Sequence, residues 1–236
     1  MRLDVILDAL PNLLVGAGIT VQLTAIAIFF GLIGGSLMGI ARLSPIPAVR
    51  IVTRIYVDFF RGTPLLVQIF VVYFGVPSLI QSMGSQFSFS RPAAAILALS
   101  LNATAYIAEI VRSGIQSIEM GQREASESLG LSPTQTMGYV IFPQAFRRII
   151  PPLGNEFITL LKDTSLVAII GYEELFRRGQ LVVATNYRSF EIFGTVALVY
   201  LVMVVVLSQG FSWLENALNP ANRGKRTKPT SVVEEV

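Results

Sequence analysis

Three ionisable side chains, Glu156, Lys162 and Asp163, interrupt the otherwise apolar stretch NEFITLLKDTSLVAIIG. An ionisable group within a bilayer costs on the order of 2.5–3.5 kcal/mol by insertion scales, so such groups persist where they face water, a partner or a substrate. At helical spacing Glu156, Thr159 and Asp163 share one face, and Lys162 points elsewhere. The alternative is an amphipathic helix that enters the membrane only after Asp163, although the residues that follow are too few to span it.

A second candidate segment carries Asp58, Arg61 and Gln68 around the sequence Gly-Thr-Pro, which ends at Pro64. Pro64 lacks a backbone N–H and therefore bends or opens a helix. A broken, polar backbone at membrane depth is tolerated only where protein or a cavity surrounds it. For Asp58 and Arg61 the alternative is an ion pair at the membrane interface, because the two residues are one helical turn apart.

A third polar set lies in the apolar segment that begins at Arg91. Asn102, Tyr106 and Glu109 follow one another at i, i+4 and i+7, which places them on one helical face. We expect this face to point into a helix bundle or along a pathway rather than at lipid.

A polar stretch, EASESLGLSPTQTMGYVIFP, separates two of the apolar segments. A helical run ends at Leu129, and Gly130 stands where a left-handed helix cap is needed. Ser132 then opens a second helix, with Pro133 at its first position and Gln135 completing a capping box. Two helices therefore meet at a well-specified corner. Such a corner suits a docking site; the alternative is a plain solvated loop between two capped helices.

The composition indicates an integral membrane protein. Of the 236 residues, 53% are hydrophobic and only 14% are charged, against roughly 25% charged in soluble domains. The mean hydropathy is +0.63. The sequence has no cysteine and no histidine, which excludes disulfides, thiolate metal sites and the commonest catalytic base.

The first apolar segment presents a face of small residues. No charged residue occurs between positions 9 and 41, and Ala27, Gly31, Gly35 and Gly39 recur there every four positions. This pattern predicts close packing against another helix.

We expect an all-α integral membrane protein with five transmembrane helices. The predicted spans are 13–41, 55–76, 92–112, 155–171 and 192–214, within a single domain of residues 1–220. Residues 221–236 are predicted to be a disordered cytoplasmic tail. Most Lys and Arg residues fall on one side of this topology, which places the C-terminus and the polar corner in the cytoplasm and the N-terminus outside.

The polar corner resembles the "EAA" signature of permease subunits in bacterial ATP-binding-cassette (ABC) importers. Glu124, Ala125, Gly130 and Pro143 match that signature in register, whereas Ser126, Val140 and Phe142 depart mildly from it. The resemblance covers nearly the whole chain. The segments ITVQLTAIAI, RGTPLLVQIF, NATAYIAEIVRSGIQSI, GQREASESLG and FPQAFRRIIPPLGNEFITLLKDTSLV look like the subgroup that carries polar amino acids such as histidine, arginine and glutamine.

This resemblance implies the type I ABC importer permease fold in a bacterial inner membrane. It implies an ABC ATPase dimer, a second permease copy or a homologous permease, and an extracytoplasmic amino-acid-binding protein as partners, with no role for nucleic acid. The cytoplasmic coupling region, 121–143, would seat on the ATPase through Glu124, Ala125, Leu129, Gly130, Leu131, Ser132 and Pro133. Glu124 would either bond to the ATPase surface or cap an amide of its own loop.

The chain has no phosphate-binding loop of the form G-x-x-x-x-G-K-[ST]. We therefore expect it not to be an enzyme and to hold no cofactor, with ATP bound by the separate ATPase subunit.

The resemblance also implies a substrate site at the membrane midplane, formed by Glu156, Lys162 and Asp163 with Thr63, Pro64 and Leu66. Lys162 suits an α-carboxylate and Asp163 an α-ammonium group, unless the two pair with each other. Glu156 suits a cationic side chain, which predicts a basic amino acid: arginine, lysine or histidine. In the alternative, Glu156 pairs with a protein arginine such as Arg61.

Two other functions remain open at this point. The substrate can be glutamine, glutamate or a broad set of polar amino acids, because an external binding protein makes the first selection. A proton-coupled secondary transporter would instead use Glu109, Glu156 and Asp163 as a relay, but it would need no docking corner.

Overall fold

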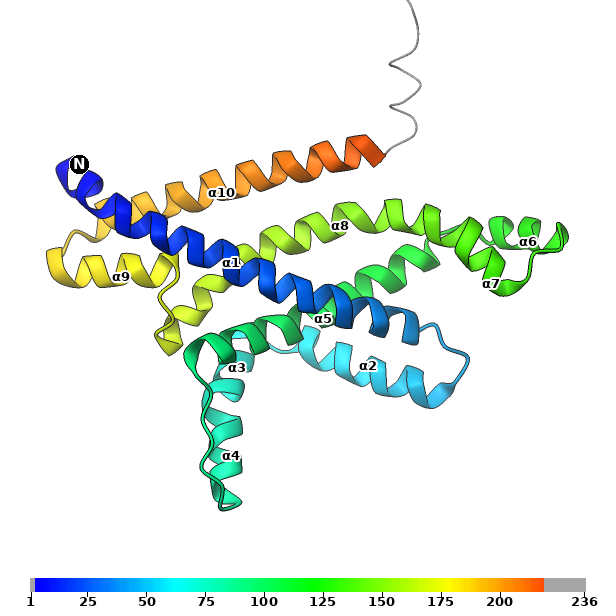
Figure 1. Ribbon diagram of the computed structural model, residues 1–236, viewed down its shortest axis with the longest axis horizontal. Helices are drawn as coiled ribbons and strands as arrows, with labels where there is room; N and C mark the ends of the chain where they lie inside the picture. The colour runs from blue at the N-terminus through cyan, green and yellow to red at the C-terminus, as the bar shows by residue number, and fades with distance from the viewer. Residues whose placement is uncertain (1–2, 219–236) are drawn as a thin grey trace, which may run out of the picture.

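The computed structural model describes residues 3–218, which form helices joined by short loops (Figure 1). The α-helices are α1 (Leu3–Ala41), α2 (Pro47–Gly62), α3 (Leu65–Phe70), α4 (Val76–Ser82), α5 (Arg91–Gln116), α6 (Met120–Ser128), α7 (Pro133–Gln135), α8 (Phe142–Asp163), α9 (Leu175–Asn186) and α10 (Ser189–Leu218). Two π-helical turns, η1 (Val71–Gly75) and η2 (Thr136–Ile141), and one 3₁₀ segment, η3 (Thr164–Ile170), continue them. The all-α prediction is confirmed. The predicted disordered tail lies outside the described residues.

Close packing of α1 against α5 forms the centre of the molecule. The small-residue face of α1 lies at this contact: a Cβ added to Gly31 would stand 2.7 Å from Cβ of Ala103. A Cβ added to Gly35 would stand 2.7 Å from Ile107 and 2.9 Å from the carbonyl oxygen of Thr104. The glycines therefore permit the close approach that their spacing predicts.

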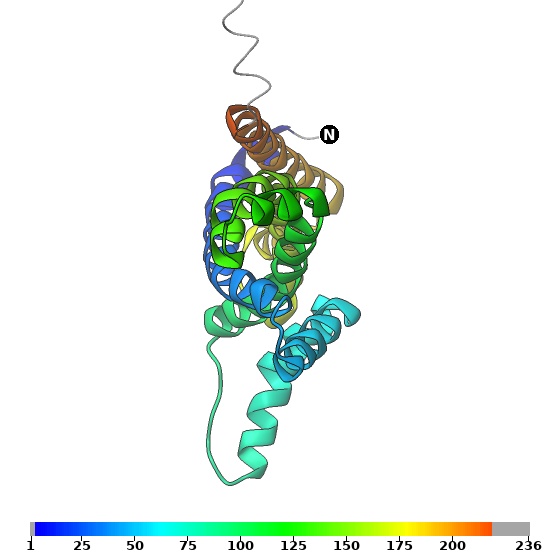
Figure 2. The ribbon, with the colours of Figure 1, turned by 90° about the vertical axis from the view of Figure 1, so that its right-hand side faces the viewer.

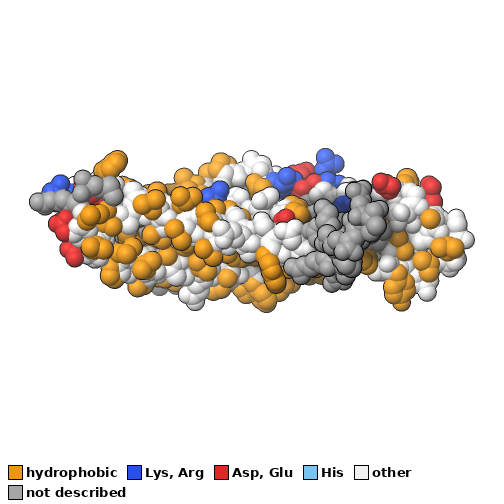
Figure 3. All heavy atoms as spheres, turned by 90° about the horizontal axis from the view of Figure 1, so that it is seen from above, with side chains coloured by type: hydrophobic (Ala, Val, Ile, Leu, Met, Phe, Trp, Pro, Cys, Tyr) orange, Lys and Arg blue, Asp and Glu red, His pale blue; other side chains and the backbone are white. Residues whose placement is uncertain are grey.

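Figure 1 shows how the elements extend from this centre. At one end, α9 and α10 pack against the first half of α1 around a second apolar cluster that includes Leu13, Leu175 and Ile192. At the opposite end lie α6 and α7. Helix α4 and the loop after it project away from the bundle, as Figure 2 also shows. In Figure 3 charged side chains lie toward both ends of the molecule, whereas apolar side chains cover much of the surface between them.

Four helical segments of the described residues are long and apolar enough to cross a membrane. They are Leu3–Ala41, Leu65–Ser82, Arg91–Gln116 and Ser189–Leu218. The second differs from the predicted range 55–76, because α2 ends at Gly62 and the chain is extended at Thr63 and Pro64. The predicted span 155–171 comprises the second half of α8 and η3, and its charges set it apart from these four segments. Whether it crosses the membrane stays a prediction.

One carboxylate joins three elements near the far end of α1. Glu109 of α5 accepts hydrogen bonds from Arg42, which follows α1, and from Arg112, one turn along α5. Arg61, at the end of α2, lies 3.8 Å from the same carboxylate and stacks over the ring of Tyr106. Asp58 pairs with Arg54 instead, so the alternative ion pair between Asp58 and Arg61 is not formed.

We expect Gly35→Ala to lower the thermal stability of the protein, because the new methyl group would meet Ile107 and the backbone of α5. Overpacking of this kind costs about 1–3 kcal/mol. The matched control is Gly18→Ala on the same helix, where nothing lies within 4 Å of the added atom. Thermal unfolding in detergent, followed by size-exclusion chromatography, measures both variants. Equal melting temperatures for the two variants would show that α1 and α5 do not pack in this way.

Candidate functional site

The polar corner has the two helix caps that the sequence predicts. Gly130 adopts a left-handed conformation with φ of 83°. The N–H of Gly130 bonds to the carbonyl of Glu127, and the N–H of Leu131 bonds to that of Ser126, at 2.9 and 3.1 Å. This pair of bonds is a Schellman motif, which satisfies the last carbonyls of α6. No atom lies within 4 Å of a Cβ added at Gly130, so glycine is needed there for its conformation and not for space.

The next helix begins two residues later with a complete capping box. The Ser132 N–H donates to Oε1 of Gln135 at 2.9 Å, and the Gln135 N–H donates to the Ser132 hydroxyl at 3.4 Å. Pro133 occupies the first helical turn. The two caps fix the direction of both helices and leave a defined, convex turn between them.

The surface of the corner is unusually apolar for a solvated turn. Leu129, at its tip, is 84% exposed, and Tyr139 is 76% exposed. Large exposed apolar side chains rimmed by polar residues are typical of interaction surfaces. The carboxylate of Glu124 forms no hydrogen bond or salt bridge within residues 3–218. The prediction that it caps an amide of its own loop is therefore not met.

The corner is joined rigidly to the body of the protein. From Pro133 to Asp163 the chain is helical throughout, as α7, η2 and α8 follow one another without a break. Gln144 of α8 donates to Gln122 of α6 at 3.1 Å, and Arg148 of α8 donates to the carbonyl of Ser117 after α5. A displacement of the corner must therefore also displace α8.

The far end of this helical run carries the charged residues of the predicted substrate site. Glu156 and Asp163 are half-buried. Neither forms a salt bridge within the described part of the chain, nor does Lys162. Arg61 lies beside Glu109 instead, so the alternative ion pair between Glu156 and Arg61 is not formed.

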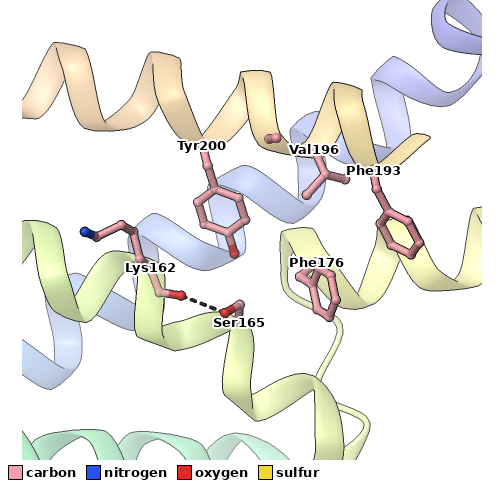
Figure 4. Close-up of a pocket in the computed structure, with 7 residues that line it drawn as sticks. Lys162, Ser165, Phe176, Phe193, Val196 and Tyr200 are labelled. Carbon is pink, nitrogen blue, oxygen red and sulfur yellow. Dashed lines mark hydrogen bonds between the residues drawn. The ribbon is translucent and has the colours of Figure 1, made fainter. Parts of the chain in front are cut away.

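Lys162 faces a different part of the protein. It lines a cavity of about 330 Å³ between η3, α9 and α10, together with Ser165, Phe176, Phe193, Val196, Ala197 and Tyr200. In Figure 4 the ammonium group points away from the rings of Phe176 and Phe193. None of the other five predicted substrate residues lines this cavity. The structure therefore separates Lys162 from the face of Glu156 and Asp163.

A buried carboxylate, which sequence reasoning missed, fixes the wall of that cavity. Glu174 is fully buried and accepts hydrogen bonds from the N–H groups of Phe176 and Arg177, at the start of α9, and from the Tyr200 hydroxyl at 2.9 Å. Burial raises the pKa of Glu174, and these hydrogen bonds oppose the rise. The bonds hold the start of α9 against α10.

The other predicted substrate residues lie at the junction between α2 and α3. Thr63 is half-buried, whereas Pro64 and Leu66 are exposed. Pro64 is the N-cap of α3, and no side chain caps that helix. Helix α3 packs on η3, the segment that directly follows Asp163. The junction and the charged end of α8 thus belong to the same region of the bundle.

The polar face predicted on α5 is confirmed. The residues that it contacts on other helices were not predicted. Asn102 donates to the side chain of Gln68, Tyr106 lies under Arg61, and Glu109 binds Arg42 and Arg112. The periodicity of this face was the signal that these side chains point inward. No local pattern identifies contacts between residues that are 34 or 67 positions apart.

Comparison with known proteins places these features in a family. Residues 27–224 match the family described as "Binding-protein-dependent transport system inner membrane component". The glutamine transport system permease protein GlnP of Escherichia coli is 40% identical over 200 residues, which are 85% of this chain and 90% of GlnP. The arginine transport system permease protein ArtQ of Bacillus subtilis is 37% identical over 199 residues, which are 84% of this chain and 89% of ArtQ.

Solved structures agree with the sequence comparison. A crystal structure of an amino acid ABC transporter with histidines matches with a TM-score of 0.86 and 35% identity, covering 92% of this chain and 99% of that one. A MetNI methionine ABC transporter shares the fold, with a TM-score of 0.70 at 22% identity over 89% of this chain and 97% of that one. The chain therefore belongs to the family of binding-protein-dependent transport system inner membrane components, and it is a permease subunit of an amino-acid ABC importer.

Proposed function

We propose that this permease moves basic amino acids across the membrane by alternating access, driven by an ATPase that docks at the polar corner. The observation that carries the proposal is the helical run from Pro133 to Asp163, which joins a capped, exposed corner to a charged helix face. At 1.5 Å per residue the run is about 45 Å long, enough to connect a cytoplasmic surface with the interior of a bilayer.

The docking surface consists of the residues around the turn: Glu124, Ala125, Leu129, Gly130, Leu131, Ser132 and Pro133. Leu129 supplies an apolar anchor that its own chain leaves uncovered. The carboxylate of Glu124, which has no partner within residues 3–218, supplies a charge-assisted hydrogen bond to the ATPase surface. Both features are typical of the centre and rim of a protein interface.

The mechanism requires a rigid connection and two copies of the permease. ATP binding closes the ATPase dimer, and the docked corner moves with it. Because α8 is continuous with the corner, its charged face tilts between the two sides of the membrane. A second copy of this chain or a homologous permease forms the other wall, and an extracytoplasmic binding protein delivers the amino acid.

The substrate assignment rests on Glu156. Its carboxylate is half-buried and has no salt bridge within residues 3–218, so a cationic side chain of the substrate can pair with it. Asp163 on the same face suits the α-ammonium group, and Thr63, Pro64 and Leu66 bound the site from the side of α3. Lys162 serves the α-carboxylate only if its side chain swings away from the cavity against α9 and α10 during transport.

A second substrate class has specific support. GlnP, which is named for glutamine transport, is somewhat more similar to this chain than ArtQ, which is named for arginine. In that alternative the permease carries glutamine, glutamate or a range of polar amino acids, and Glu156 accepts hydrogen bonds from a neutral side chain. A proton-coupled transporter, with Glu109, Glu156 and Asp163 as its relay, has less support because Glu109 is already bound to two arginines.

Amino-acid uptake into vesicles tests the source of energy. We expect uptake by the permease to require the added ATPase subunit and ATP, and to continue when a protonophore removes the proton gradient. Vesicles that lack only the ATPase are the control. Uptake that needs no ATPase, or that stops with the protonophore, would contradict an ATP-driven importer and support the proton-coupled alternative.

Substitution of Gly130 tests the docking corner. We expect Gly130→Ala to weaken the binding of purified ATPase to the permease by roughly 5- to 30-fold, because a left-handed alanine costs about 1–2 kcal/mol. Gly210→Ala in α10 is the matched control, since Gly210 lies outside the coupling region, is exposed and helical, and has nothing within 4 Å. Equal ATPase affinities for the two variants would exclude Gly130 from the docking surface.

Substitution of Glu156 tests the substrate class. We expect Glu156→Gln to reduce the preference for arginine over glutamine by about 10- to 100-fold, the value of a hydrogen bond to a charged group. The same binding protein is used throughout, so a changed preference originates in the permease. Glu191→Gln, in the first turn of α10, is the control, since Glu191 is half-buried like Glu156. An unchanged preference in Glu156→Gln would refute the assignment to basic amino acids.

A further inference from the structure

The break between α2 and α3 leaves backbone groups that ordinary helix geometry cannot satisfy. Thr63 and Pro64 are extended, with φ and ψ of −119° and 145° and of −63° and 135°. Pro64 also has no N–H to offer to the preceding turn. The last carbonyls of α2 therefore need other donors, because an unpaired carbonyl away from water destabilises the fold.

A single side chain supplies those donors. Nε2 of Gln68 lies 2.8 Å from the carbonyl oxygen of Phe60, 3.0 Å from that of Thr63 and 2.9 Å from the hydroxyl of Thr63. The Thr63 hydroxyl in turn donates to the carbonyl of Phe59 at 2.8 Å. Gln68 is only 4% exposed. Its amide thus closes the break from inside the protein.

A second buried amide sets the orientation of the first. Nδ2 of Asn102, on α5, donates to Oε1 of Gln68 at 2.9 Å. With Oε1 engaged by this donor, the NH₂ group of Gln68 must face the break. The hydroxyl of Tyr56, on α2, donates to the carbonyl of Leu101 at 2.8 Å, which ties α2 to the same part of α5. These two hydrogen bonds therefore fix the position of the break relative to α5, the helix that packs against α1.

We propose that Gln68 is a positioning residue for substrate binding. Oriented by Asn102, it holds the extended Thr63–Pro64 segment in the conformation that the substrate meets. Gln68 itself does not touch the substrate, because it is buried and its amide is fully engaged with protein groups. The inference rests on the proposed function, which places Thr63, Pro64 and Leu66 in the substrate site.

Equilibrium binding separates positioning from a general loss of folding. The permease–ATPase complex, without the binding protein, is titrated with radiolabelled arginine and, in parallel, glutamine; the Kd and the number of sites per complex are recorded. We expect Gln68→Met, which keeps the length of the side chain and removes its donors, to raise the Kd about tenfold with an unchanged number of sites. Asn102→Ala should raise the Kd less, since the donors of Gln68 remain.

Ser100→Ala is the matched control. Ser100 lies on α5, is buried, and its hydroxyl has no hydrogen-bond partner in the described part of the chain. The Ser100→Ala complex should therefore bind the amino acid with the Kd of the wild type. If the Gln68→Met complex fails to assemble or has fewer binding sites, the Kd of the Asn102→Ala complex tests the inference instead. A Kd for Asn102→Ala equal to that of the wild type would then overturn the inference. If the wild-type complex binds arginine and Gln68→Met binds it with the same Kd, the positioning role of Gln68 is refuted, whereas the proposed substrate site stands. A wild-type complex that binds neither amino acid overturns the proposed substrate site together with it.

Discussion

A single helical run, unbroken from Pro133 to Asp163, connects the corner of the protein to the interior of its bundle. It joins the exposed corner, which the capping box of Ser132 and Gln135 fixes, to a charged face inside an apolar bundle. Pro143, Pro151 and Pro152 each remove a backbone donor within this run, and the run stays helical past all three. A π-helical turn directly precedes the first of them. Hydrogen bonds also join the run to α6 and to the end of α5.

Two kinds of buried or half-buried polar side chain matter for the proposed site. Glu109, Gln68 and Glu174 have their hydrogen-bonding capacity engaged by other helices, and each joins two or three elements. Glu156 and Asp163 have no salt bridge among the described residues although they lie in an apolar segment. Satisfied groups of the first kind stabilise the bundle, because loss of a partner would leave them unpaired away from water. Groups of the second kind are those that we propose to bind the substrate.

Much of this architecture follows from local sequence. The conformation of Gly130, the capping box at Ser132, and the inward face of Asn102, Tyr106 and Glu109 were all predicted and are confirmed, because each depends on residues within two helical turns. The contact between Arg42 and Glu109 could not be predicted, since it joins residues 67 positions apart. The same holds for Lys162, whose surroundings are set by the packing of α9 and α10, and for Gln68, whose partners depend on how the break folds back.

A distance measurement between spin labels tests the rigid connection most directly. The chain has no cysteine, so spin labels attach only to cysteines that are introduced. One variant carries cysteines in place of Thr134 and Asn155, and a second carries them in place of Thr134 and Val202. All three positions are exposed. The first pair lies about 30 Å apart along the helical run. In the full complex, that distance should stay the same with and without ATP, whereas the distance from Thr134 to Val202 of α10 should change. A nucleotide-dependent change between Thr134 and Asn155, with none to Val202, would contradict transmission through a rigid helix.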